Sequence, residues 1–335
     1  MPGATDQALL DGVLRGRGEV QRRAVAKTIT LLESTRADHR TRAEAVLDAL
    51  LPASGQSFRV GISGVPGVGK STFIESLGLQ LIAQGHRVAV LAVDPSSSVS
   101  GGSILGDKTR MERLSVEANA FIRPSPTGGT LGGVAAHTRE AMIVLEAAGH
   151  DVVIVETVGV GQSETAVAGM TDFFLLLQLP NAGDDLQAIK RGVMELADLV
   201  AINKADLDPA AATRAQAQIT SSLRLMQQRT DAHDDGAARW QPRVITLSAV
   251  TGSGVAECWR IASEHRAQHE ASGRLLARRH EQDEAWMWER IHALLAERFG
   301  AHAKVAAALP ALASDVRAGR VAASVAARRL VDLMD

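Results

Sequence analysis

Runs of apolar residues alternate with helix-like stretches through the middle of the chain. Several runs are continuous rather than alternating, as in VAVLAV at 88–93 and VVIV at 152–155. Continuous runs are typical of strands buried on both faces, as in a parallel sheet covered by helices. The strands predicted in this way are Phe58–Ser63, Arg87–Val93, Ala120–Arg123, Asp151–Glu156, Phe173–Leu179, Leu199–Asn203 and Val244–Ser248. We therefore expect an α/β domain over residues 57–256, with a doubly wound, mostly parallel sheet flanked by helices.

Both ends of the chain lack such runs and predict helices. Residues 1–56 are expected to form an N-terminal helical segment, with helices near Val20–Leu32 and Ala43–Leu51. Residues 257–335 are expected to form a C-terminal helical arm, in which Gly300 and Pro310 interrupt the pattern. A last helix is predicted over Ser314–Leu333.

An apolar stripe runs along the predicted C-terminal arm. Trp288, Ile291, Leu295 and Phe299 recur at helical spacing within residues 283–299. Such a stripe either packs on the chain's own core or forms a seam between two copies of the chain, and the spacing alone favours neither.

Composition excludes several classes of protein. With 46% hydrophobic and 22% charged residues, the 335-residue chain can form a packed core. A net charge of −2, balanced charges at both ends and 3% aromatic residues argue against nucleic-acid binding. The apolar runs are too short to span a membrane, and the N-terminus lacks an apolar signal core, so we expect a cytoplasmic protein without a membrane partner. The single cysteine, Cys258, excludes an internal disulfide framework and a cysteine-rich metal site.

A phosphate-binding motif follows the first predicted strand. Residues 64–72 match G-x-x-x-x-G-K-[ST] and precede a predicted helix over Thr72–Gln84. Glycines let the loop's N–H groups point at phosphate oxygens, and the helix adds its positive end. The lysine can reach the β- and γ-phosphates, and the first hydroxyl can ligate Mg²⁺. Although glycine-rich loops join strands to helices in many folds, the complete motif in this setting predicts a triphosphate site. Its residues are Gly64, Val65, Pro66, Gly67, Val68, Gly69, Lys70, Ser71 and Thr72.

A second motif, N-K-x-D, closes the strand Leu199–Asn203. The carboxylate of Asp206 can accept hydrogen bonds from the two donors on guanine, whereas adenine would leave it unpaired. The stem of Lys204 can lie on the base. Ser248-Ala249, at the end of the strand Val244–Ser248, matches the usual backbone clamp on the guanine carbonyl. Four residues alone would often be a solvated turn, but after a phosphate loop they predict GTP and GDP rather than ATP.

Three acidic residues stand where strands or loops should face the phosphates. They are Asp94 in VDPSSS, Asp107 in GDKTRM and Glu156 in ETVGVGQ. Glu156 is a good candidate to hold a water ligand of Mg²⁺, and Gly159 could donate its N–H to the γ-phosphate. Some of these acids could instead cap helices or turns. The polar loop 178–191 is either a functional loop or an ordinary surface loop, and its composition does not decide between them.

Long contiguous motifs give the chain a specific resemblance to a known family. GVPGVGKST, VLAVDPSS, GDKTRM, FIRPSPTGGTLGG, VVIVETVGVGQSE, GDDLQAIKRG and NKAD resemble the MeaB/ArgK family of P-loop GTPases. The resemblance covers about residues 12–256 well, and the C-terminal arm only in character. The resemblance implies that the chain hydrolyses GTP and that the catalytic residues are Lys70, Asp94, Asp107 and Glu156. It also implies that Ser71 and the same three acidic residues hold Mg²⁺.

The resemblance also implies further site residues and partners. It places guanine on Asn203, Lys204, Asp206, Ser248, Ala249 and Val250, and a partner-sensitive switch at Asp184, Gln187 and Lys190. It implies a homodimer formed through the C-terminal arm, in a chaperone that gates adenosylcobalamin loading into methylmalonyl-CoA mutase and protects or reactivates it. A related B12-dependent acyl-CoA mutase is the alternative partner. Other open functions are a kinase of arginine and ornithine transport, a nickel metallochaperone GTPase and a non-enzymatic scaffold that binds GTP.

Overall fold

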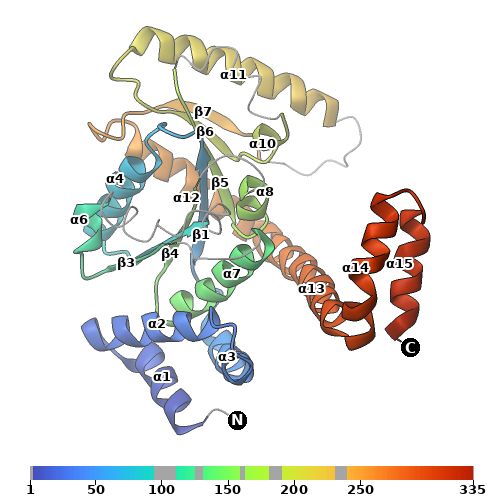
Figure 1. Cartoon of the computed structure of the whole chain (residues 1–335). Helices are drawn as coiled ribbons and strands as arrows, with labels where there is room; N and C mark the ends of the chain where they lie inside the picture. The colour runs from blue at the N-terminus through green and yellow to red at the C-terminus, as the bar shows by residue number, and fades with distance from the viewer. Residues whose placement is uncertain are drawn as a thin grey trace. The chain divides into compact units, whose positions relative to one another are not determined.

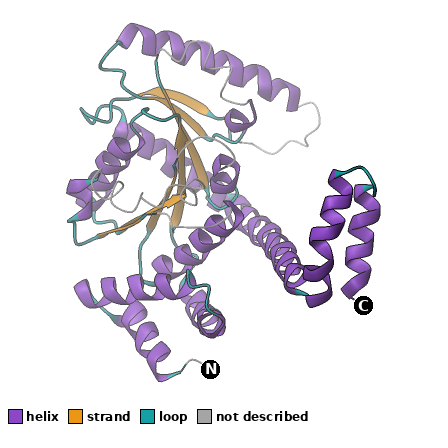
Figure 2. Cartoon of the chain, viewed as in Figure 1, coloured by secondary structure: helices purple, strands orange, loops and turns teal. Residues whose placement is uncertain are grey.

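Seven parallel strands form one sheet at the centre of the first unit of the chain (Figures 1 and 2). The computed structural model describes residues 3–93, 111–124, 131–158, 163–180, 191–230 and 240–334. The strands stand in the order β3-β2-β4-β1-β5-β6-β7. Their bounds are β1 Phe58–Gly64, β2 Val88–Val93, β3 Ala120–Arg123, β4 Val152–Thr157, β5 Phe173–Gln178, β6 Leu199–Ile202 and β7 Arg243–Thr246. All seven predicted strands are present, and the predicted doubly wound fold is confirmed.

Helices cover both faces of this sheet, which is why its central strands are largely apolar. Every residue of β2, β4 and β5 is buried. One face carries α4 (Lys70–Ala83) and α12 (Val255–Ala271). The other face carries α7 (Leu131–Ala147), α8 (Ser163–Ala168) and α11 (Pro209–Thr230). The two short helices α6 and α10 span Glu112–Ser115 and Arg191–Glu195.

Three N-terminal helices pack beside α7. Their bounds are α1 Ala4–Arg15, α2 Gly18–Leu32 and α3 Ala37–Leu50, followed by a 3₁₀ turn at Leu51–Ala53. The buried amide of Gln21 ties them to the sheet domain, because its Nε2 donates to Val13 O at 2.7 Å and Ala148 O at 3.0 Å. Its Oε1 accepts from Arg87 Nη2 at 2.8 Å. The sequence pattern did not predict α1.

By its internal contacts the chain divides into two compact units, Met1–Arg279 and His280–Asp335. The helix α13 (Arg274–Ala301) begins in the first unit, where Arg279 fixes it to the amino-terminal edge of the sheet. The guanidinium of Arg279 donates to both carboxylate oxygens of the fully buried Asp172, at 2.8 and 2.6 Å, and to Gly55 O and Ser57 O. A charge buried in this way is stabilised by its partner and its hydrogen bonds.

The second unit corrects the helix predicted over Ser314–Leu333. Two helices stand there, α14 (Ala303–Arg317) and α15 (Ala323–Val331), with a 3₁₀ turn at Asp332–Met334. The break comes from Gly319, which adopts a left-handed φ of 69°, while Gly319 N donates to Val316 O and Arg320 N to Asp315 O. These two hydrogen bonds form a Schellman motif, which ends a helix.

Of the two predicted interruptions, the one at Gly300 falls one residue before α13 ends at Ala301, whereas the one at Pro310 is wrong. Gly300 lies inside the last turn of α13, and Pro310 lies inside α14. Pro310 is exposed, so the carbonyl group that loses its helical hydrogen bond can be solvated there.

Candidate functional site

The loop between β1 and α4 has the conformation that its glycines allow. Gly67 and Gly69 have φ of 77° and 96°, in the left-handed region that favours glycine. Val68 N donates to Val65 O at 3.2 Å, which closes the turn. Lys70 begins α4, and its ammonium donates to Gly64 O at 2.7 Å, so the charged group stays at the loop. The strand, loop and helix required by the phosphate motif are therefore in place.

The side chain of Asn203 joins this loop to the loop after β7. It follows β6 and is 1% exposed. Its Nδ2 donates to Val68 O at 2.8 Å, and its Oδ1 accepts from Ala249 N at 3.0 Å. A Cβ added to Gly69 would lie 2.7 Å from Asn203 Nδ2, so glycine is the residue that fits there. The structure thus brings together three predicted segments that are far apart in the sequence.

The turn after Asn203 exposes the predicted base-reading carboxylate. Lys204 has φ of 61°, rare for a residue with a side chain, and it is the only such residue other than glycine in the described parts of the chain. Ala205 N donates to Leu247 O at 3.1 Å, which holds the turn against the end of the β7 segment. Asp206 is exposed, as a group that binds a ligand from solvent must be.

The Ser248-Ala249 segment is held by its own hydrogen bonds. Ser248 N donates to Ser253 O, and Ser248 Oγ accepts from Thr251 N at 3.2 Å. Ala249 is buried against Asn203, whereas the side chain of Val250 is 79% exposed.

Glu156 lies at the carboxyl-terminal end of β4, beside the strand that leads into the phosphate loop. It is 2% exposed and pairs in register with Ile62 of β1. The neighbouring residues, Thr157 and Ser63, join their hydroxyls at 3.0 Å. No motif predicted this hydroxyl pair, although a hydroxyl residue at the end of each of two apolar strands was the available signal.

The described residues offer oxygen donors suited to magnesium. Ser71 in the first turn of α4 and Glu156 at the end of β4 supply a hydroxyl and a carboxylate. Mg²⁺ at nucleotide sites uses one or two protein oxygens together with phosphate and water oxygens. Within the described segments, no group of three or more His, Cys, Asp or Glu residues could hold a metal ion, and magnesium beside a triphosphate does not need one.

Gln178 is a polar residue at the same edge of the sheet. It ends β5 and is fully buried, and neither its Oε1 nor its Nε2 has a hydrogen-bond partner among the residues that the structure describes. Its backbone oxygen accepts from Asn203 N at 2.8 Å. An amide without partners in a buried position would be destabilising, and this one lies next to the site.

Six predicted site residues lie outside the described residues. They are Asp94, Asp107, Gly159, Asp184, Gln187 and Lys190. Their roles stay predictions.

Cys258 is buried, and burial raises the pKa of its thiol to about 12. The thiol is therefore protonated at neutral pH, whereas the thiolate is the form that binds metals. No helix within the described part of the chain is long and apolar enough to cross a bilayer.

Comparisons with known proteins agree with this geometry. A family model described as "Methylmalonyl Co-A mutase-associated GTPase MeaB" matches residues 25–304. A relative from Caulobacter vibrioides, named as a GTPase, is 56% identical over 310 residues, which are 92% of this chain and 93% of that protein. The mouse "Methylmalonic aciduria type A homolog, mitochondrial" is 45% identical, over 97% of this chain and 80% of that protein. A crystal structure of a protein named "LAO/AO transport system kinase" is 34% identical, with a TM-score of 0.76 over 100% of this chain and 99% of that chain.

Proposed function

The chain belongs to the MeaB family of GTPases, and from that membership we propose that its GTPase cycle serves as a chaperone for methylmalonyl-CoA mutase. In this cycle, GTP binding and hydrolysis gate the loading of adenosylcobalamin into the mutase and protect or reactivate it. A related B12-dependent acyl-CoA mutase is the alternative client. The family match over residues 25–304 carries the proposal, and the name of the mouse relative supports it.

We assign the nucleotide by the position of each group. The loop 64–72 holds the phosphates, with the ammonium of Lys70 on the β- and γ-phosphates. Asp206 accepts from guanine, and the Ser248-Ala249-Val250 backbone contacts the guanine carbonyl. The bridge made by Asn203 supports this assignment, because it fixes the phosphate loop and the base loop at one distance.

Magnesium would be held by Ser71 and Glu156 together with Asp94 and Asp107. When bound, it supplies positive charge to the phosphate oxygens. The hydroxyl of Ser71 would bind the magnesium ion. Lys70 neutralises charge that develops on the transferred phosphoryl group, and Gly159 N–H contacts the γ-phosphate. Catalysis in this scheme depends on positioning and charge neutralisation.

The switch and the dimer arm complete the proposal. Asp184, Gln187 and Lys190 are assigned to a partner-sensitive switch, through which the partner would accelerate slow intrinsic hydrolysis. For the arm, exposure of the α13 stripe supports a seam between two copies of the chain. Trp288 and Leu295 are 51% and 55% exposed, and Met287 and Leu294 beside them are also exposed.

GTP turnover measured with and without the mutase tests this function. We expect stimulation of the wild type, loss of basal turnover in Lys70→Ala, and normal basal turnover with lost stimulation in Lys190→Ala. Wild-type turnover that does not respond to the mutase would contradict the chaperone role, and full stimulation of Lys190→Ala would contradict the switch.

A turnover assay with labelled nucleotide distinguishes our proposal from a transport kinase. The protein in the similar crystal structure carries that name. A kinase would move the γ-phosphate of ³²P-labelled nucleotide to a protein acceptor. Our proposal requires release of all the label as inorganic phosphate.

A further inference from the structure

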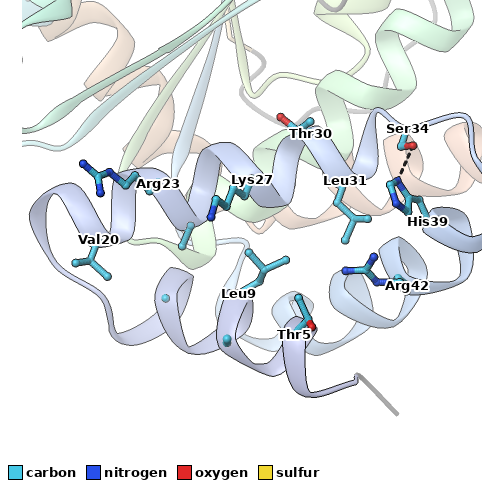
Figure 3. A pocket seen from close by; sticks show the side chains of 13 residues that line it. Thr5, Leu9, Val20, Arg23, Lys27, Thr30, Leu31, Ser34, His39 and Arg42 are labelled. Carbon is cyan, nitrogen blue, oxygen red and sulfur yellow. Dashed lines mark hydrogen bonds between the residues drawn. The ribbon is translucent and has the colours of Figure 1, made fainter.

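A groove lies between α1 and α2, on helices that the nucleotide site does not use. It has a volume of about 650 Å³. Leu9 of α1 and Leu31 of α2 point into it, as Figure 3 shows, and Arg42 of α3 stands at one end. Val20 also lines it and is 66% exposed, so the apolar floor is open to solvent.

The close contact of the two helices at one point explains the shape of the groove. A Cβ on Gly12 would lie 2.6 Å from Ala24 Cβ, so the helices touch at this pair and no larger side chain fills the space there. Along α2 the lining residues run from Val20 to Leu31. At 1.5 Å per residue that is roughly 17 Å, or about three helical turns.

The charge on the lining residues has one sign. Arg23, Lys27 and Arg42 line the groove together with His39, and no aspartate or glutamate is among its described lining residues. Arg42 is paired with the buried Asp6, through an Nη2–Oδ1 contact of 2.7 Å. Arg23 and Lys27 are exposed, one helical turn apart on α2, and within the described residues neither forms an ion pair. Two cations therefore lie beside an apolar floor in a chain whose net charge is −2.

We propose that this groove docks an acidic amphipathic helix of a partner protein. An apolar stripe of that helix would lie on Leu9, Val20 and Leu31, in the manner of helix-in-groove recognition. Carboxylates beside the stripe would pair with Arg23 and Lys27. The length of the groove favours a helix of several turns over a compact small molecule, and the positive charge of its lining favours an acidic occupant.

A selection experiment with the full chain tests the proposal. The probe is a displayed library of peptides of about 20 residues, long enough to span the roughly three turns of the groove, whose positions vary among apolar, acidic and basic residues. We expect the enriched peptides to have leucine-like residues at i, i+3/i+4 and i+7, flanked by Glu or Asp. Fluorescence anisotropy of an enriched peptide should show at least tenfold weaker binding to the double variant Arg23→Glu/Lys27→Glu. Binding should also weaken as salt is raised.

Two further variants locate the site. Arg214→Glu/Arg224→Glu makes the same charge change on exposed positions of α11 and should bind within about twofold of wild type. Ala8→Trp adds a large side chain at an exposed lining position and should block binding while the circular dichroism spectrum stays that of wild type.

Three results would overturn the proposal. They are enriched peptides without an acidic excess, equal binding of a peptide with the same composition in scrambled order, and binding that survives both groove variants. Sedimentation of the chain without any peptide gives a fourth result that could overturn the proposal. If Arg23→Glu/Lys27→Glu dissociates a dimer of the wild type, the occupant is a second copy of this chain and not a partner protein.

Discussion

The side-chain nitrogen of Asn203 donates a hydrogen bond of 2.8 Å to the carbonyl oxygen of Val68, which lies 135 residues earlier in the chain. The same side chain accepts from Ala249 N. One buried amide thus sets the spacing between the loop that carries the phosphate motif and the loop that carries the base clamp.

Replacing this amide should affect both folding and ligand binding. Asn203→Leu leaves Val68 O and Ala249 N without their partner, and we expect a loss of about 3 kcal/mol in the free energy of unfolding. GDP affinity, measured with a fluorescent analogue, should fall at least tenfold. Gln21→Leu is the control, since it also removes a buried amide that joins distant segments, in this case by donating to Val13 O and Ala148 O far from the site. It should lose stability and keep GDP affinity; equal losses of affinity in both variants would argue against a specific role for Asn203.

Asp206→Asn should change which purine the protein prefers. An amide cannot accept from both guanine donors, so the ratio of GDP to ADP affinity should fall by at least about 100-fold. Because Asp206 is exposed, the unfolding midpoint should not move. Asp208→Asn, two residues on, alters a group that accepts from Ala211 N at the start of α11 and should leave the purine ratio intact. An unchanged ratio in Asp206→Asn would remove the assignment of this carboxylate to guanine.

Gln178→Met should stabilise the apo protein. It removes a buried amide that lacks hydrogen-bond partners among the described residues and keeps the volume similar, so we expect a gain of about 1–2 kcal/mol in urea unfolding. Gln216→Met provides the opposite case, because Gln216 Nε2 donates to Val244 O at 2.8 Å. That variant should lose stability. A loss in Gln178→Met as well would mean that its amide is satisfied in solution.

Stability should fall as the pH drops from 7 to 5. Burial, with a smaller effect of the nearby Arg87 charge, lowers the pKa of His150 to about 4. In the unfolded chain His150 binds a proton at its ordinary pKa of about 6.5, whereas in the folded chain it stays neutral down to about pH 4. Between these two pH values the unfolded chain holds one more proton, so the free energy of unfolding falls as the pH drops. The loss from pH 7 to pH 5 should be roughly 2 kcal/mol.

His150→Gln should flatten this pH dependence, measured by urea unfolding at each pH. Met142→Ala, a buried apolar residue on the neighbouring helix α7, is the control for lower stability as such. It should shift the whole curve down and keep its slope. A slope that persists in His150→Gln would assign the proton uptake to another group.

The apolar pattern predicted the sheet well because burial on both faces leaves no choice of residue type. The apolar pattern does not predict the last residue of a strand, because turns determine where a strand ends. β5 ends at Gln178 and β6 at Ile202, each one residue before the predicted end. In the helical ends the pattern failed for α1 and for Ser314–Leu333. Gly319 was the available signal for the second failure, while Pro310, exposed on α14, was a misleading one.

For the site, local motifs were sufficient to find the phosphate loop and the base strand. They could not predict the Asn203 bridge, because its two partners lie in other segments and the contact exists only after the sheet has formed. The polar residues Ser63, Thr157 and Gln178 were hidden in otherwise apolar strands. Their significance comes from the shared edge of the sheet, which the strand order sets.

The lack of room between Gly69 and Asn203 has an evolutionary corollary. A Cβ at position 69 meets the amide nitrogen at position 203, and the left-handed φ of 96° disfavours a side chain there whichever residue stands at 203. A substitution of Gly69 should therefore stay harmful even when Asn203 is shortened to make room. Anyone who redesigns this pocket would have to keep the glycine codon at position 69 and vary the residues around it.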